Sequence, residues 1–384
     1  MFTRKLQSSI AKWLFKGQVI IIYGARQVGK TTLARKIAKE FVDENGLDAN
    51  LVLYFDCDLI ENQDLFSSQS KVLFENVVGN KKIIIIDEAQ RVPNIGINLK
   101  ILHTHFPDLQ IIATGSSSFD LANKINEPLT GRSLQFDLYP LSIAEIGQKY
   151  NVLEISSLFN EIFRFGLYPA IFGENSEIAE QKLTNLSSNY LYKDLLMLED
   201  VQKSSVLIKM LQYLAVHIGS EFSYTELGQE LGINKATAEK YLDLLQKCFV
   251  IYKLKPLKRS ITKEITHPFK VYFWDLGIRN SLIQQFNNLE LRSDIGGLWE
   301  NFCITERIKQ NSYNNLNKNY YFWRTKDGKE FDFVEESGGK FEVFEFKWSQ
   351  VKLGKFHQEF FDTYLGSTLS IINRKNWFEF IDLK

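Results

Sequence analysis

Residues 24–31 form a glycine-rich segment with the sequence Gly-Ala-Arg-Gln-Val-Gly-Lys-Thr, which limits the possible folds of this chain more than any other segment. It matches the pattern GxxxxGK[ST] and lies between an apolar run that ends at Tyr23 and a helical pattern that begins near Thr31. In a loop with these neighbours, backbone N–H groups surround a phosphate and the helix N-terminus adds partial positive charge. The segment therefore predicts a phosphate-binding loop at the end of a buried strand.

The chemistry of the loop side chains points to ATP with Mg²⁺. Lys30 is expected to reach the β- and γ-phosphates, and the Thr31 hydroxyl is expected to ligate the metal ion. A chance glycine-rich turn is the alternative, but it would not explain the strand and helix on either side. We expect the nucleotide to contact the whole segment: Gly24, Ala25, Arg26, Gln27, Val28, Gly29, Lys30, Thr31 and Thr32.

Polar residues that suit the same site follow two later apolar runs. Four isoleucines lead into Asp87 and Glu88; Asp87 is expected to hold Mg²⁺, and Glu88 to act as the general base that polarises the attacking water. Thr114, at the end of the next run, is expected to lie at the nucleotide and orient that water, although a Ser/Thr cluster at a strand end explains it equally well. Arg132 is a candidate arginine finger or charge sensor, with a solvated or salt-bridged surface arginine as the alternative.

The distribution of apolar runs predicts an α/β protein. Before residue 145 such runs alternate with helical patterns, which is typical of a parallel sheet covered by helices on both faces. Helical spacing then dominates, and later segments combine helices with short strands. We predict four parts: a P-loop domain at 1–145, a helical lid or linker at 146–217, a winged helix-turn-helix at 218–285 and a C-terminal α/β domain at 286–384.

Charge and cysteine content limit the classes of partner and compartment. Lys plus Arg and Asp plus Glu both number 46, so any contact with nucleic acid requires a local patch. Cys57, Cys248 and Cys303 have no metal-ligand or disulfide-framework spacing, which favours a reducing compartment. No apolar run approaches the roughly 18 to 20 residues that span a bilayer. The expectation is a cytoplasmic protein without a membrane partner.

The third part has the pattern of a DNA-binding motif. Two helices are predicted around a turn at Gly232, with Asn234 as the N-cap of the second helix. The second helix also carries Glu239 and Asp243, so a winged helix that only packs and transmits the state of the ATP site stays an alternative to DNA contact. The strand-like runs that follow can form the wing, whose local basic patch consists of Lys253, Lys255, Lys258, Arg259 and Lys263.

Three carboxylates and one ammonium are expected to converge near the C-terminus. Glu345 and Lys347 share one face of a strand by period-two alternation, and Asp332 lies on the neighbouring strand of a hairpin that turns near residues 337–339. Asp332 and Glu345 could hold Mg²⁺ or Mn²⁺, Glu300 could support a ligand, and Lys347 could activate the attacking water. The alternative is a nuclease-like fold without catalysis, whose charge cluster is structural or binds nucleic acid without cutting it. Glu342 is predicted to face the other side of the sheet.

The chain resembles a prokaryotic family of predicted AAA-type ATPases that carry a C-terminal domain of unknown function. That domain resembles the restriction-endonuclease fold, and the positions above are similar to its PD-(D/E)xK pattern. The resemblance rests on the loop and on residues 85–90, 113–117, 129–132, 138–142, 165–169 and 273–277. It implies an AAA-type sheet domain, a helical linker with a winged helix, and a nuclease-like domain.

Three functional hypotheses remain open from the sequence. The first is an ATP hydrolase whose nucleotide state controls a winged-helix and nuclease-like module on DNA. The second is a nucleotide-dependent regulatory or scaffold protein whose C-terminal domain does not cut. The third is a DNA-binding transcriptional regulator. A finger role for Arg132 would require a neighbouring subunit, so the sequence also leaves a homo-oligomer open.

Overall fold

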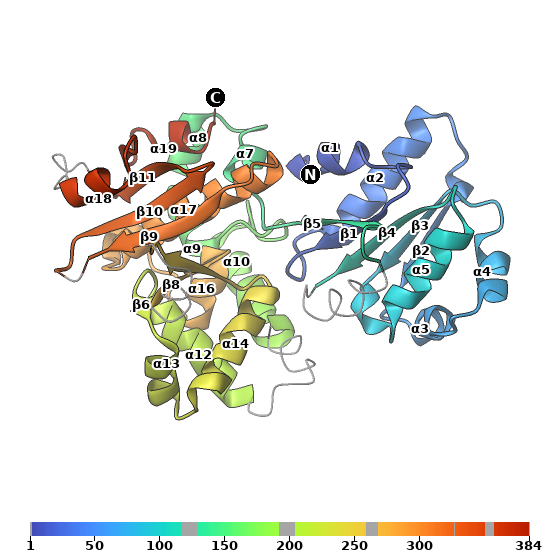
Figure 1. Ribbon diagram of the computed structural model, residues 1–384, viewed down its shortest axis with the longest axis horizontal. Coiled ribbons are helices and arrows are strands. Elements are labelled where there is room, and N and C mark those ends of the chain that lie inside the picture. The colour runs from blue at the N-terminus through green and yellow to red at the C-terminus, as the bar shows by residue number, and fades with distance from the viewer. Residues whose placement is uncertain are drawn as a thin grey trace. The chain divides into compact units, whose positions relative to one another are not determined.

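A computed structural model describes residues 2–116, 129–191, 204–258, 268–325, 327–349 and 357–383. The chain divides into two compact units. The first contains residues 1–140 and 247–249, and the second contains residues 141–246 and 250–384. Each unit is described by itself below (Figure 1).

The first unit is a five-stranded parallel sheet in the order β2-β3-β4-β1-β5. Helix α1 packs on α2, whereas α5 packs against α3 and α4. The strands are β1 (Val19–Tyr23), β2 (Val52–Asp56), β3 (Ile83–Asp87), β4 (Gln110–Gly115) and β5 (Ser133–Asp137). The helices are α1 (Lys5–Ala11), α2 (Lys30–Glu44), α3 (Ile60–Ser67), α4 (Lys71–Val78) and α5 (Ile95–His105), with 3₁₀ turns η1 (Ala49–Leu51) and η2 (Ala89–Arg91).

Burial explains why the strands of the first unit could be predicted. Every residue of β1, β3 and β4 is buried, so near-continuous β-branched runs are favoured there. The parallel sheet predicted from those runs is confirmed. Strand β5 was not predicted, because its residues are only partly buried and its sequence is not a continuous apolar run.

The second unit contains a seven-stranded mixed sheet in the order β12-β11-β10-β9-β7-β8-β6. Its strands are β6 (Glu221–Phe222), β7 (Ile251–Pro256), β8 (Phe269–Phe273), β9 (Asn319–Arg324), β10 (Glu330–Ser337), β11 (Lys340–Phe346) and β12 (Thr368–Ile372). Its helices are α7 (Ile143–Ile146), α8 (Val152–Ser157), α9 (Phe159–Phe165), α10 (Ser176–Asn185), η3 (Leu186–Leu191), α12 (Ser204–Val216), α13 (Tyr224–Leu231), α14 (Lys235–Lys247), α16 (Leu276–Leu282), η4 (Leu289–Leu291), α17 (Ile295–Tyr313), α18 (Gln358–Thr363) and α19 (Trp377–Phe380).

One strand pairing joins segments that the sequence treats as separate domains. Strand β7 pairs with β8 in antiparallel fashion on one side and with β9 in parallel on the other. The base of the expected wing hairpin is therefore part of a larger sheet. The expected boundaries at 217/218 and 285/286 fall inside one compact unit, and the division of that unit into separate domains stays a prediction.

Two sequence motifs pack on each other in the second unit. The Asp275 carboxylate accepts hydrogen bonds from the N–H groups of Leu167 at 2.6 Å and Ile278 at 3.0 Å. Gly166 has φ +72°, and a Cβ there would collide with the Asp275 carboxylate; a Cβ at Gly277 would collide with the carbonyl oxygen of Phe165. The glycines of residues 165–169 and 273–277 are thus explained by close backbone approach.

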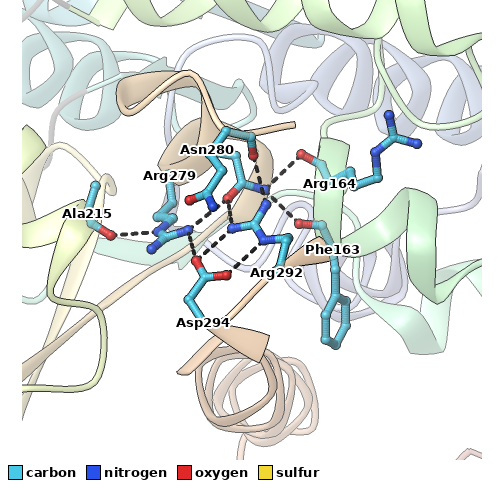
Figure 2. Close-up of polar contacts among 8 residues, drawn as sticks. Phe163, Arg164, Ala215, Arg279, Asn280, Arg292 and Asp294 are labelled. Atoms are coloured by element: carbon cyan, nitrogen blue, oxygen red, sulfur yellow. Dashed lines mark hydrogen bonds and ion pairs between the residues drawn. The ribbon is translucent and has the colours of Figure 1, made fainter. Parts of the chain in front are cut away.

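A buried polar cluster completes this junction (Figure 2). Arg279 and Arg292, which are 1% and 6% exposed, both donate to the carboxylate of Asp294. Both also donate to the side-chain oxygen of Asn280, whose amide donates to the carbonyls of Phe163 and Arg164. The cluster therefore ties the segment after β8 to helix α9.

Helix lengths and compositions also bear on the membrane question. Within the described part of the chain, no helix is both long and apolar enough to cross a membrane.

Candidate functional site

The phosphate loop connects β1 to α2 in the first unit. Gly24 is required by close packing, since a Cβ there would collide with the carbonyl oxygen of Leu138. Gly29, just before α2, has φ +98°, a conformation that favours glycine. Val28 is fully buried, so it can offer a ligand only its backbone. The predicted loop thus has the strand, the glycines and the helix N-terminus that phosphate binding needs.

The Lys30 ammonium lies at the mouth of the loop. Its Nζ donates to the carbonyls of Gly24 at 3.1 Å and Ala25 at 3.0 Å, and it lies 3.9 Å from Oε1 of Glu88. The side chain is only 3% exposed. The loop and the end of β3 therefore share a positive charge at the position expected to meet the phosphates.

Asp87, at the end of β3, is surrounded by hydroxyl groups. Thr31 Oγ1 and the Tyr54 hydroxyl each donate to Asp87 Oδ2 at 2.7 Å, and the Thr114 hydroxyl donates to Oδ1. Burial, together with the hydrogen bond to Asp87, raises the pKa of Tyr54, and the Arg35 guanidinium stacks on its ring at 3.7 Å. Hydroxyl and carboxylate oxygens are the ligands that Mg²⁺ prefers, so Thr31 and Asp87 fit the predicted metal ion.

Glu88 has an unusual backbone and a well-defined side chain. Its φ of +51° is left-handed, which is uncommon for a residue with a side chain and typical of functional positions. Its N–H donates to Thr114 Oγ1 at 3.2 Å. Gln90 Nε2 donates to Glu88 Oε2 at 2.5 Å and to Ser116 Oγ at 3.0 Å. Gln90 therefore orients the carboxylate expected to act as base.

Arg132 lies at the other end of the sheet. Strand β5 pairs with β1 in parallel, with Ser133 opposite Val19 and Asp137 opposite Tyr23. Arg132 immediately precedes β5 and is exposed, and its carbonyl accepts from the N–H of Val19. A five-residue strand spans about 16 Å, so Arg132 does not reach the loop of its own subunit. A charge-sensor role in the same subunit is not supported, and a finger role in trans stays a prediction.

Arg4 is a residue of this site that sequence reasoning missed. Its guanidinium donates to the carbonyl of Val28 at 2.6 Å and to that of Tyr139 at 2.5 Å. Arg4 is 8% exposed. Tyr139 is followed by Pro140, where the first stretch of the first unit ends. Its ring lies edge-on to Phe249, with 6.1 Å between the ring centroids. Arg4 thus ties the phosphate loop to the end of the first unit.

The fold brings together one part of the expected C-terminal charge cluster, Asp332 and Lys347. Strands β10 and β11 pair in the predicted hairpin. Asp332 Oδ2 accepts from the N–H of Phe346 at 2.8 Å and lies 3.8 Å from Lys347 Nζ. The pKa of Glu345 is raised above its ordinary value, mainly by burial. The Lys347 charge lowers this pKa, and the Asp332 charge raises it further. Glu342 is exposed and pairs with Lys318 instead, as the alternation predicts.

Glu300 has a partner that the sequence did not suggest. Lys270, from β8, is 3.1 Å from Glu300 Oε1 and also pairs with Glu330, while the Tyr272 hydroxyl donates to Glu300 at 2.5 Å. Burial raises the pKa of Glu300, Lys270 lowers it and Asp332 raises it. Among the described residues, no three His, Cys, Asp or Glu side chains form a group that could hold a metal ion. Of the carboxylates expected to bind metal, Glu300 thus pairs with the ammonium of Lys270, and Asp332 lies 3.8 Å from that of Lys347.

The expected basic wing is only partly exposed to solvent. Lys253 Nζ donates to the Tyr224 hydroxyl at 2.8 Å, and burial lowers its pKa, so this lysine does not belong to a surface patch. Lys255 is exposed, whereas Arg259 and Lys263 lie outside the described residues. Asn234 caps α14 as predicted, accepting from the N–H of Thr237 at 2.8 Å.

Comparisons with known proteins bear on each part of the chain. Residues 16–147 match the model of a family described as an AAA domain. Residues 156–289 and 295–375 match two families described as domains of unknown function, DUF8612 and DUF4143.

Relatives are found in bacteria and archaea. A Mycobacterium tuberculosis protein described as uncharacterized is 27% identical over 353 residues, which cover 90% of this chain and 73% of that protein. A Methanocaldococcus jannaschii protein, also described as uncharacterized, is 26% identical over 302 residues, 70% of this chain and 63% of that protein. The solved structure of the Aeropyrum pernix ORC2 protein (ADPNP-ADP complexes) has a TM-score of 0.43 at 14% identity and covers 73% of this chain and 93% of that chain. Residues 16–147 therefore match an AAA domain, and the loop within them has the strand, the glycines and the helix N-terminus of a phosphate-binding loop.

Proposed function

We propose that the N-terminal unit binds ATP with Mg²⁺ and hydrolyses it, and that its nucleotide state controls the second unit. One observation carries the proposal. The carboxyl ends of the adjacent strands β1, β4 and β3 bring Lys30, Thr114, Asp87 and Glu88 to one edge of the sheet. This is the set of an ammonium, a hydroxyl and two carboxylates that phosphoryl transfer to water needs.

Binding is expected to redirect the Lys30 ammonium. In the structure it donates to two loop carbonyls, and the β- and γ-phosphates offer it more strongly charged acceptors. The N–H groups after Gly24 and at the start of α2 supply neutral donors for the same oxygens. Thr31 and Asp87 would hold the Mg²⁺ ion, which neutralises phosphate charge when bound.

Hydrolysis is assigned to Glu88. Asp87 already accepts three hydroxyl hydrogen bonds, so its oxygens are assigned to the metal ion and its hydroxyl partners. Oxygen Oε2 of Glu88 accepts a hydrogen bond from Gln90. The other carboxylate oxygen, Oε1, lies 3.9 Å from the Lys30 ammonium. That arrangement suits a carboxylate that takes a proton from water beside the γ-phosphate.

ATP turnover by the full chain tests this assignment. Glu88→Gln should lower kcat by about 10²- to 10⁴-fold, the usual contribution of a general base, while ATP affinity is kept. Lys30→Ala should lose both binding and turnover. Glu75→Gln on α4, which removes a carboxylate whose side chain is 47% exposed, is the matched control and should behave as wild type. Unchanged turnover in Glu88→Gln would refute the base assignment.

Control of the second unit is supported by packing at the end of β5. The loop contacts Leu138 at Gly24, and Arg4 joins Val28 to Tyr139. A change at the phosphate loop therefore acts on the residues that lead out of the first unit. A scaffold protein that uses the same switch without cutting nucleic acid is the second candidate, and the ammonium within the carboxylate cluster favours it.

DNA is the proposed partner of the second unit. Helix α14 carries lysines at positions 235 and 240, both exposed, in the second helix of a helix-turn-helix pair. Replacing both with glutamine should weaken DNA binding and reduce its salt dependence. The same double change at Lys36 and Lys39, in the first unit, is the control. Equal affinity and salt slope in the two double variants would contradict the DNA proposal.

A further inference from the structure

Lys270 is a buried lysine inside a group of acidic side chains. It lies on β8, is 4% exposed, and its Nζ is 3.1 Å from Glu300 Oε1. The same Nζ pairs with Glu330, on β10. The ammonium also lies over the ring of Phe322, 5.6 Å from the ring centroid. The lysine therefore links helix α17 with two non-adjacent strands of the sheet.

The groups around Lys270 include the residues expected to form a metal site. The charge of Asp332 acts on Lys270, on Glu300 and on Glu345. Buried carboxylates need a nearby positive charge, because ionised groups are costly to remove from water unless they are paired. In this chain an ammonium supplies that charge where a divalent cation would otherwise supply it.

The ammonium keeps its charge in this setting. Its Nζ pairs with carboxylate oxygens of both Glu300 and Glu330, and nearby negative charges favour the charged form of a lysine. A charged ammonium in contact with Glu300 repels any second cation at the same oxygens. The residues present therefore do not fit a divalent metal ion while β8 keeps its register.

We propose that the Lys270 ammonium replaces the divalent cation in the carboxylate cluster of the second unit, so that this nuclease-like site binds no catalytic metal. The inference goes beyond the ATPase function and does not depend on it. It assigns to Lys270 a role in holding Glu300 and Glu330 together, beside Asp332. It also makes the second unit a non-cutting module in this arrangement of strands.

Titration of the nucleotide-free full chain with Mn²⁺, followed by the electron paramagnetic resonance signal of the free ion, tests the proposal. Wild type and Asp332→Asn should bind the same amount of Mn²⁺, because any ion at the phosphate loop contributes equally to both. Mn²⁺ that is bound by wild type and lost in Asp332→Asn would overturn the proposal. This comparison holds even if no Lys270 variant folds.

Replacing the lysine should open the site. Lys270→Met removes the ammonium and leaves the carboxylates, so it should bind one further Mn²⁺ more than about a hundredfold tighter than wild type, given the repulsion between close cations. The added ion should disappear in the double variant with Asp332→Asn. Lys270→Arg, which keeps the positive charge, should bind as wild type.

A matched control separates this effect from a general loosening of the unit. Lys309 is also buried and pairs with Glu306 in α17. Lys309→Met should leave Mn²⁺ binding unchanged. A folded Lys270→Met protein that binds no more Mn²⁺ than wild type, or a Lys309→Met protein that gains the same ion, would overturn the proposal.

Discussion

Removing the Arg4 guanidinium is expected to loosen the phosphate loop. In Arg4→Ala the carbonyls of Val28 and Tyr139 lose their charged donor. Hydrogen bonds to a charged group contribute about 1.5 to 3 kcal/mol each. Taking the lower figure for each, since water can partly replace the donor at an 8% exposed site, the loop should lose about 3 kcal/mol of local stability. That corresponds to about a hundredfold increase in its local opening.

Hydrogen exchange on the full chain measures this opening directly. Peptides that cover residues 24–31 should exchange about a hundredfold faster in Arg4→Ala, and ATP affinity should fall because the loop must be ordered before it binds. The matched control is Lys12→Ala, which removes a positive charge from an exposed residue. Lys12 directly follows helix α1, and Arg4 directly precedes it. Exchange rates that are equal in the two variants would refute the role given to Arg4.

Three further predictions concern other parts of the chain. Asp294→Asn should destabilise the second unit by about 3 to 5 kcal/mol, because two buried guanidinium groups lose their carboxylate. Burial raises the pKa of Asp294, but the two arginines lower it, and on balance it lies below its ordinary value of 3.8. The stability that this group gives the wild type is therefore present above about pH 4 and is lost as the pH falls through the lowered pKa, which an acid unfolding titration checks. Gly166→Ala should unfold the unit at a temperature several degrees lower in calorimetry, because a Cβ at φ +72° collides with Asp275. Arg132→Ala should leave turnover unchanged at low protein concentration and reduce it only where subunits associate; an equal loss at every concentration would contradict a finger role in trans.

Local patterns were sufficient to locate the residues of the proposed nucleotide site. The loop, its strand and its helix are contiguous, and Asp87 and Glu88 end a run of four isoleucines, so the parallel sheet brought them together as expected. Thr114 was predictable for the same reason, because parallel strands end at one edge.

Long-range contacts account for what the sequence did not predict. Arg4 meets Tyr139 across 135 positions, and no local pattern marks an arginine that donates to backbone carbonyls. Lys270 was part of a run interpreted as a wing strand, and only the pairing of β7 with β9 brings that strand into the same sheet as Glu330. Arg132 was assigned from its motif alone, and its distance from the loop follows from the register of β5 against β1.

The proposed control of the second unit by nucleotide state can be measured as a change in a distance between the two units. Spin labels at Val72 in the first unit and Leu316 in the second, which are 65% and 49% exposed, can be introduced in a Cys248→Ser background because the other cysteines are buried. In Glu88→Gln, which should trap ATP, the pulsed-resonance distance distribution should shift on adding ATP. An unchanged distribution in a protein that binds ATP would contradict the account.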